Sequence, residues 1–237
     1  TNINGTHYIL SAVKEFASSI KFYFAGSSEM FGKVKESPQN ENTLFYPRSP
    51  YGISKVTGYY LTKNYRDAYN LHASNGILFN HESPRRGFEF VTRKISQGVA
   101  RIKKGFQKKI KLGNIKSKRD WGHAKDYVEA MWMMLQQEEP IDLVISTGET
   151  YSVMDFLQEA CDQTGLDPNA IVKIHDFYKR PNEVDHLCGD STKAKTILGW
   201  KPRVKFRELV KIMINCELGR SPDPYEQIWD QNQQGRN

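Results

Sequence analysis

The stretch Ile20-Lys-Phe-Tyr-Phe-Ala25, followed by Gly26-Ser-Ser-Glu-Met-Phe-Gly32, predicts a β-strand that ends in a turn of small and hydroxyl residues. Open α/β folds bind their ligands at the carboxyl edge of the sheet, so this turn would present its hydroxyls there. A simpler interpretation is a hydrogen-bonded turn at Ser27 and Ser28, with Glu29 as a solvated loop acid. The turn alone does not decide between the two.

Further along the chain, Ser49-Pro-Tyr-Gly-Ile-Ser-Lys55 places Tyr51 and Lys55 four residues apart at the predicted start of a helix. Side chains at i and i+4 lie on one helix face, so this phenol and ammonium can approach one substrate together. A neighbouring cation favours phenolate over phenol. Such a pair could take a proton from a sugar or steroid hydroxyl while a nicotinamide accepts hydride. The spacing by itself occurs often by chance.

Around these two stretches, the sequence pattern alternates between helices and strands. Helices are expected at residues 4–18, 50–69, 90–104, 124–137, 153–164, 192–198 and 206–218. Strands are expected at residues 20–25, 76–79, 110–113, 142–147 and 171–174. Ser152 and Asp155 should cap the fifth helix, and Gly199 should end the sixth. The alternation predicts an α/β fold with a parallel sheet.

The composition narrows the class of protein. The 237 residues are 38% hydrophobic, and no apolar run approaches the ~20 residues that a membrane span needs. Neither a signal peptide nor a metal-binding spacing of histidines is visible, and the three separated cysteines suggest reduced thiols, so we expect a cytoplasmic protein without a metal site. The net charge of +7 comes largely from a basic stretch at residues 101–111, but no nucleic-acid-binding motif accompanies it. A solvated helix face explains this stretch most simply, and attraction of anionic ligands is the alternative.

Four segments carry a resemblance to a known family. They are residues 26–32, 45–52, Asn75-Gly-Ile-Leu-Phe-Asn-His-Glu-Ser-Pro-Arg-Arg-Gly87 and Arg119-Asp-Trp-Gly-His-Ala-Lys-Asp-Tyr127. Together and in this order they resemble the GDP-mannose 4,6-dehydratase family of the extended short-chain dehydrogenase/reductase superfamily. The Tyr-x-x-x-Lys spacing is typical of the whole superfamily, whereas the last two segments are much more specific to this family. The similarity runs from Asn2 to about Leu218.

The resemblance implies the second half of a Rossmann domain with a smaller C-terminal substrate-binding domain. Residues 1–79 and 119–147 would belong to the NADP-binding domain, residues 80–118 and 148–220 to the substrate domain, and residues 221–237 to a polar tail. The Gly-rich turn that opens the superfamily's first domain is not in this sequence, so we expect the parent protein to be longer.

The same resemblance implies a reaction on a hexose. Tyr51, assisted by Lys55, would remove the proton of the sugar 4-hydroxyl as hydride leaves C4. Glu29 would then remove the C5 proton, which the 4-keto group acidifies, and water would leave from C6. Ser27 stands where the family has threonine and would bond the sugar oxygen. Hydride returned to C6 gives GDP-4-keto-6-deoxymannose.

Binding residues also follow from the resemblance. Lys55, His81 and Arg86 would contact NADP together with Tyr51. The nucleotide sugar, GDP-mannose, would be contacted by Asn80, Lys94, Arg119, Arg180 and Glu183. The family also implies a homo-oligomer, a dimer or a tetramer. Two alternatives stay open: another nucleotide-sugar dehydratase or epimerase, and a non-catalytic nucleotide-sugar-binding fragment. An epimerase would need Glu29 less than a dehydratase does.

Overall fold

The structure is a computed structural model that describes residues 2–178, 182, 184 and 186–220. Within this range the chain forms two compact units. Unit 1 comprises residues within Thr1–His81, Lys118–Thr150 and Arg180–Arg203. Unit 2 comprises residues within Glu82–Ser117, Tyr151–Lys179 and Val204–Asn237.

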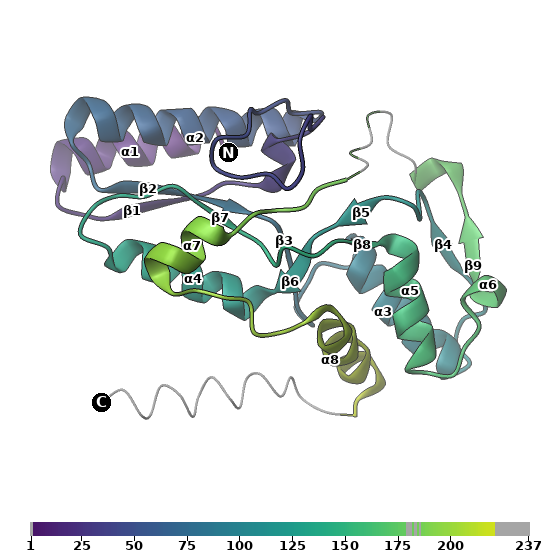
Figure 1. The fold of residues 1–237 in the computed structure, drawn as a ribbon. Coiled ribbons are helices and arrows are strands. Elements are labelled where there is room, and N and C mark those ends of the chain that lie inside the picture. Colours follow the sequence, from purple (N-terminus) through teal and green to yellow (C-terminus); the bar gives the residue numbers. More distant parts are fainter. Residues whose placement is uncertain (1, 179–181, 183, 185, 221–237) are drawn as a thin grey trace, which may run out of the picture. The chain divides into compact units, whose positions relative to one another are not determined.

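Unit 1 is built on a parallel sheet in the order β1-β2-β7, formed by β1 (Phe22–Ala25), β2 (Ala73–Leu78) and β7 (Leu143–Ile145). The register pairs Phe22 with Ala73 and Leu78 with Ile145. Helices α1 (Asn4–Phe16) and α2 (Pro50–Tyr69) cover one face, and α4 (Ala124–Gln136) and α7 (Thr192–Leu198) cover the other (Figure 1). This arrangement is the α/β fold with a parallel sheet that the alternation predicts.

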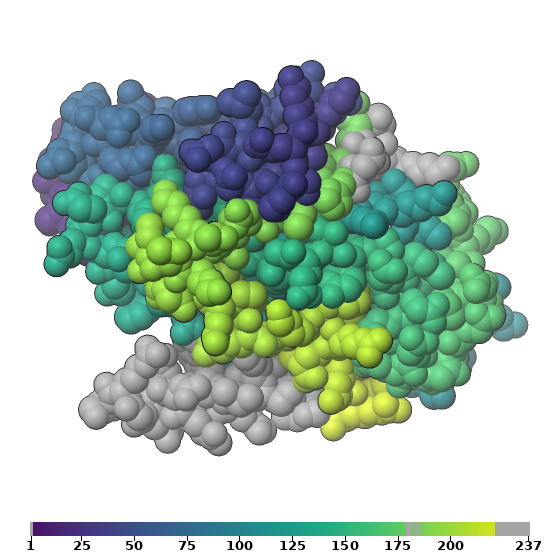
Figure 2. Space-filling model, viewed as in Figure 1, coloured from purple at the N-terminus to yellow at the C-terminus, as the bar shows by residue number. Residues whose placement is uncertain are grey.

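The remaining elements of unit 1 are short. They are the 3-10 turn η1 (Ser28–Met30), β5 (Lys118–Arg119) and β6 (Trp121–His123), while β3 (Asn80–Glu82) runs from unit 1 into unit 2. A loop after η1 extends the unit through Gln39, whose backbone N donates to Cys188 O at 2.7 Å and whose carbonyl accepts from Asp190 N at 2.7 Å. Figure 2 shows this dark purple loop beside the yellow-green segment that contains Cys188.

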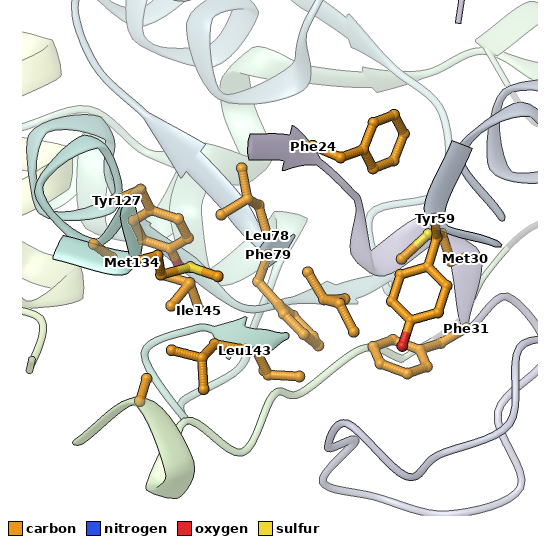
Figure 3. Close-up of a cluster of buried hydrophobic side chains, with 14 of the residues drawn as sticks. Phe24, Met30, Phe31, Tyr59, Leu78, Phe79, Tyr127, Met134, Leu143 and Ile145 are labelled. Atoms are coloured by element: carbon orange, nitrogen blue, oxygen red, sulfur yellow. The ribbon is translucent and has the colours of Figure 1, made fainter. Parts of the chain in front are cut away.

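The core of unit 1 fills both faces of the sheet. Phe79 follows β2 and is 1% exposed, and its ring lies 6.1 Å from that of Phe31. Figure 3 shows Tyr59 and Met30 gathered on the Phe31 side, and Tyr127 and Met134 of α4 on the side of Leu78 and Ile145. Val184, Leu187, Ala194, Leu198 and Trp200 belong to the same buried cluster. These described residues of the segment therefore pack with unit 1, whereas the sequence analysis grouped residues 148–220 with the substrate domain.

Most predicted elements form near their expected bounds. Ser152 makes a capping box with Asp155, and Gly199 ends α7 in the left-handed region at φ 66°, which confirms both predicted helix ends. Strand β2 begins at Ala73, three residues before the predicted start at residue 76, so that Asn75 lies inside the strand.

Unit 2 is a small helical layer with a two-stranded sheet. Helix α3 (Val91–Lys103) packs against α5 (Val153–Asp162) and α8 (Phe206–Leu218), while β4 (Ile110–Leu112) pairs in parallel with β9 (Val172–Ile174). Short β8 (Tyr151–Ser152), α6 (Pro168–Ile171) and η2 (Asp176–Tyr178) complete it. Tyr151 stacks on Phe206 with ring centroids 3.7 Å apart. No helix of the described residues is long and apolar enough to cross a membrane.

A partly buried ion pair ties helix α2 to the sheet of unit 1. Arg66 donates to both carboxylate oxygens of Asp142, at 2.7 and 2.9 Å, and Asp142 also accepts two bonds from Asn75. Burial alone would raise the pKa of Asp142, but the bonds from Arg66 and Asn75 outweigh burial and lower this pKa. These contacts satisfy the backbone and side-chain nitrogens of Asn75 inside a fully buried strand, although its side-chain oxygen has no hydrogen-bond partner among the described residues.

The other edge of β7 is capped by a side chain. Val144 N donates to Glu41 Oε1 at 2.8 Å, and Lys193 Nζ donates to Asp142 O at 3.0 Å. Among the described residues, no strand pairs with the outer edge of β1.

We expect Asp142→Asn to lower the free energy of unfolding by about 1–3 kcal/mol, because the largely desolvated Arg66 guanidinium loses its two bonds to a carboxylate. Asp67→Asn is the matched control: Asp67 also contacts Arg66, at 3.6 Å, but its side chain is 62% exposed. That change should cost less than about 1 kcal/mol. Urea unfolding of both variants measures the difference, and equal losses would contradict the importance of the Arg66–Asp142 pair.

Candidate active site

The turn after β1 is fixed by its own backbone and by the core. Ser27 caps η1, and its Oγ accepts from Glu29 N at 3.2 Å. Met30 and Phe31 are fully buried, whereas Ser27 and Glu29 remain partly exposed. The sequence left two interpretations open, a hydrogen-bonded turn and a turn that faces a ligand. The two are compatible, because Ser27 caps the turn while Ser27 and Glu29 stay partly exposed.

Glycines bring helix α2 against this turn. A Cβ placed on Gly52 would lie 2.7 Å from Glu29 O, and one on Gly26 would lie 2.8 Å from Gly76 O. Both separations are shorter than a carbon side chain tolerates. Because Gly52 directly follows Tyr51, this close contact places the start of α2 beside the backbone of Glu29.

Lys55 lies at the carboxyl end of β1. Its Nζ donates to Ala25 O at 2.9 Å and lies 5.6 Å from the ring centroid of Tyr51 and 5.3 Å from that of Phe24. Burial lowers the pKa of Lys55. Tyr51 itself is 49% exposed, so its phenol remains accessible to a ligand. Ser49 caps α2 by accepting from Gly52 N at 3.0 Å, which fixes the first turn that carries Tyr51.

Two more predicted residues of unit 1 follow shortly after β2. Asn80 and His81 lie on β3 and are both partly exposed. His81 Nδ1 lies 2.8 Å from Phe79 O, and because a carbonyl only accepts, Nδ1 is the protonated nitrogen of this pair. The His81 ring stacks on Tyr127, with centroids 4.9 Å apart.

Arg119 lies on β5, next to a buried acid whose role the sequence analysis missed. Arg119 is 8% exposed and donates to Lys118 O at 2.9 Å. Asp120 is fully buried and accepts from Thr147 N, Thr147 Oγ1, Gly148 N and Gly189 N at 2.8, 2.6, 2.9 and 3.3 Å. It therefore joins three separate segments of unit 1. The only sequence signal was its place in the Arg119–Tyr127 motif, which does not reveal a structural acid.

The other predicted residues belong to unit 2 or lie outside the description. Arg86 contacts Glu82 and Phe90, and Lys94 Nζ lies 3.4 Å from the ring centroid of Tyr178. Arg180 and Glu183 lie outside the described residues. The structure thus joins the stretches of Ser27, Glu29, Tyr51 and Lys55 within unit 1, and holds Arg86 and Lys94 within unit 2.

A hollow of about 380 Å³ opens elsewhere in unit 1, and none of the predicted site residues contributes to it. We assign it no role. Its lining comprises Pro38, Gly148, Cys188, Gly189, Asp190, Ser191, Thr192 and Lys195.

The sheet and the tyrosine–lysine pair define a protein with a Rossmann-type α/β fold. Solved structures agree: the fold matches that of RMD from Pseudomonas aeruginosa, determined in complex with NADPH, with a TM-score of 0.84 at 22% identity, over 93% of this chain and 74% of that one. The sequence profile described as GDP-mannose 4,6 dehydratase matches residues 1–213. The chain therefore belongs to the GDP-mannose 4,6-dehydratase family.

Individual relatives are closely similar. The human GDP-mannose 4,6 dehydratase is 52% identical over 236 residues, which cover 90% of this chain and 63% of the human protein. The GDP-mannose 4,6 dehydratase 1 of Arabidopsis thaliana is 56% identical over 200 residues, covering 84% of this chain and 55% of that protein. The chain thus spans 55–63% of the length of these two relatives.

We expect Gly52→Ala to destabilise the protein by about 1–3 kcal/mol, because the added methyl would force α2 away from Glu29 O. The matched control is Gly5→Ala in the first turn of α1, where a Cβ meets no atom within 4 Å. That variant should be neutral or gain about 0.5 kcal/mol from helix propensity. Urea unfolding compares them, and a Gly52→Ala protein as stable as the wild type would refute the tight contact.

Asp120 should make stability depend on pH. Burial raises the pKa of Asp120 from 3.8 to about 6, despite the bonds from Thr147, Gly189 and Gly148. The folded state then holds this proton more tightly than the unfolded state does, so the group's contribution is full below about pH 4 and is lost as pH rises through about 6.

Asp120→Asn removes this titration. The variant should be less stable than the wild type throughout, and the difference in unfolding free energy should shrink as pH rises from about 4 to about 6. Denaturant unfolding at several pH values measures this difference. A difference that stays constant with pH would show that Asp120 titrates normally in the folded protein.

Proposed function

We propose that this chain forms part of an NADP-dependent GDP-mannose 4,6-dehydratase, which converts GDP-mannose to GDP-4-keto-6-deoxymannose. Family membership supports this substrate, and one structural observation supports the chemistry. The ammonium of Lys55 is bonded to the carbonyl at the end of β1 and lies 5.6 Å from the Tyr51 ring. A helix that positions an amine and a phenol at a strand end in this way suits proton transfer from a sugar hydroxyl.

The residues present fit a nicotinamide cofactor. An ammonium has three N–H donors, and Lys55 spends one on Ala25 O, so two remain for ribose hydroxyls. Arg86 offers a planar guanidinium of the kind that recognises phosphate. When bound, NADP would accept hydride from C4 of the sugar and return it to C6.

In this proposal the chain's own side chains move the protons. Tyr51 accepts the proton of the 4-hydroxyl, and the Lys55 charge stabilises the phenolate that takes it. Ser27 bonds the sugar oxygen. Glu29 removes the C5 proton once the 4-keto group has formed, hydroxide leaves C6 as water on taking a proton, and a proton returns to C5 as hydride reaches C6. The contact of Gly52 with Glu29 O supports a common site, since it fixes the two catalytic stretches against each other.

The remaining assignments complete the proposal. His81 would be a further contact of the cofactor, and Lys94 would contact the nucleotide sugar. Asn80, Arg119, Arg180 and Glu183 would contribute to that site as the family resemblance implies. A cytoplasmic homo-oligomer, dimeric or tetrameric, is the setting that the same resemblance supports.

The decisive variant is Glu29→Gln. It should retain GDP-mannose binding and lose about 10²–10⁴-fold in turnover, because the amide cannot remove the C5 proton. The matched control is Glu36→Gln, a change of the same kind at an exposed residue of the loop that follows the turn. Formation of the 4-keto product from GDP-mannose and NADP measures turnover, and calorimetry measures binding.

Two outcomes would contradict the proposal in different ways. Full turnover by Glu29→Gln would remove Glu29 from the mechanism. Binding of GDP-mannose by the wild-type chain without any conversion, with NADP present, would favour a non-catalytic nucleotide-sugar-binding protein.

A further inference from the structure

The buried acid Glu82 forms an ion pair with Arg86, four residues further along the chain. Glu82 is 1% exposed, although carboxylates are rarely found fully buried. Its Oε2 lies 3.1 Å from Arg86 Nε and accepts from Thr92 Oγ1 at 2.6 Å. All three residues belong to unit 2. Burial of this acid is therefore compensated by a cation and a hydroxyl.

Arg86 is held on a second side by an aromatic ring. Its guanidinium carbon lies 3.6 Å from the ring centroid of Phe90, so the flat face of the guanidinium is in contact with the ring. Glu82 lies beside the buried Nε without a hydrogen bond of good geometry, and among the described residues neither terminal nitrogen makes a hydrogen bond to protein. The Arg86 side chain is 23% exposed. An arginine held by an adjacent carboxylate and by a ring on its face presents its terminal donors in a set direction.

We propose that Glu82 is a positioning residue, which orients Arg86 so that its terminal nitrogens bind phosphate oxygens of the dinucleotide cofactor. The inference rests on the proposed function, in which Arg86 contacts NADP. Two parallel N–H donors match two phosphate oxygens, and the match depends on the orientation of the guanidinium. A free arginine would lose that orientation through rotation of its side chain.

Another salt bridge of unit 2 provides a matched control. Arg93 Nε pairs with Glu217 at 2.7 Å, and Arg93 lies 5.0 Å from the Phe88 ring, so this arginine also contacts an acid and an aromatic ring. Arg93 has no proposed ligand. Glu217→Gln therefore removes a comparable ion pair from the same unit without touching Arg86.

The test is a double-mutant cycle on NADP affinity, measured by calorimetry with the purified chain. Burial raises the pKa of Glu82 to about 7, so the titrations are run at about pH 8.5, where the carboxylate is ionised. Glu82→Gln should weaken NADP binding about tenfold, and Arg86→Ala should weaken it at least as much. In the Arg86→Ala background Glu82→Gln should have no further effect, because Glu82 acts only through Arg86. Glu217→Gln should leave affinity unchanged.

A spectroscopic measurement follows the guanidinium directly. The Nε–H signal of Arg86 in a ¹⁵N-labelled protein, assigned by its loss in Arg86→Ala, should exchange slowly with water in the wild type. In Glu82→Gln it should shift and exchange faster. An Arg86 signal unchanged by Glu82→Gln would overturn the positioning role.

The affinity outcomes separate this inference from the proposed function. An equal loss of NADP affinity from Glu82→Gln in both backgrounds would show a general structural role, and would overturn the inference while leaving the cofactor site intact. Absence of NADP binding by the wild type would overturn the cofactor role of Arg86 and the inference with it.

Discussion

The candidate site depends on how closely helix α2 approaches the turn after β1. A side chain at position 52 would collide with the carbonyl of Glu29, so only glycine allows the approach. The turn itself is anchored because Met30 and Phe31 are fully buried in the core. The bond from Lys55 to Ala25 O then joins the helix to the strand end itself. Backbone contacts, rather than side-chain contacts alone, therefore position the acid and the phenol.

Buried polar groups set the geometry around this contact. Asp142 and Arg66 connect α2 to the sheet, and Asp120 joins three loop segments by accepting four hydrogen bonds. Asp120 is buried and Asp142 partly buried; each costs free energy to desolvate, and each accepts hydrogen bonds from several donors. Such groups tolerate little displacement, because a donor that moves away leaves a buried charge unsatisfied. Polar contacts of this kind therefore hold together segments that are far apart in the sequence.

Much of the fold and part of the candidate site could be predicted from the sequence. Helical periodicity and caps located the main helices, because Ser152 with Asp155 and Gly199 act through local chemistry. The placement of residues 186–203 could not be predicted, since it depends on Leu187 and Trp200 entering a core made by distant strands. The early start of β2 was hidden for a similar reason: Asn75 is a poor strand residue by propensity and is stabilised by Asp142, far away in the sequence.

The side chain of Glu41 has a consequence for the sheet as a whole. In a strand, backbone groups point alternately to the two sides, and Val144 N points away from β2, toward Glu41. The Glu41 carboxylate takes the place that the carbonyl of another strand would occupy. The Lys193 ammonium likewise takes the place of a strand N–H, by donating to the carbonyl of Asp142. Edge-to-edge association of two molecules through β7 is thereby discouraged. A further strand could pair with this edge of β7 only after both side chains had moved away.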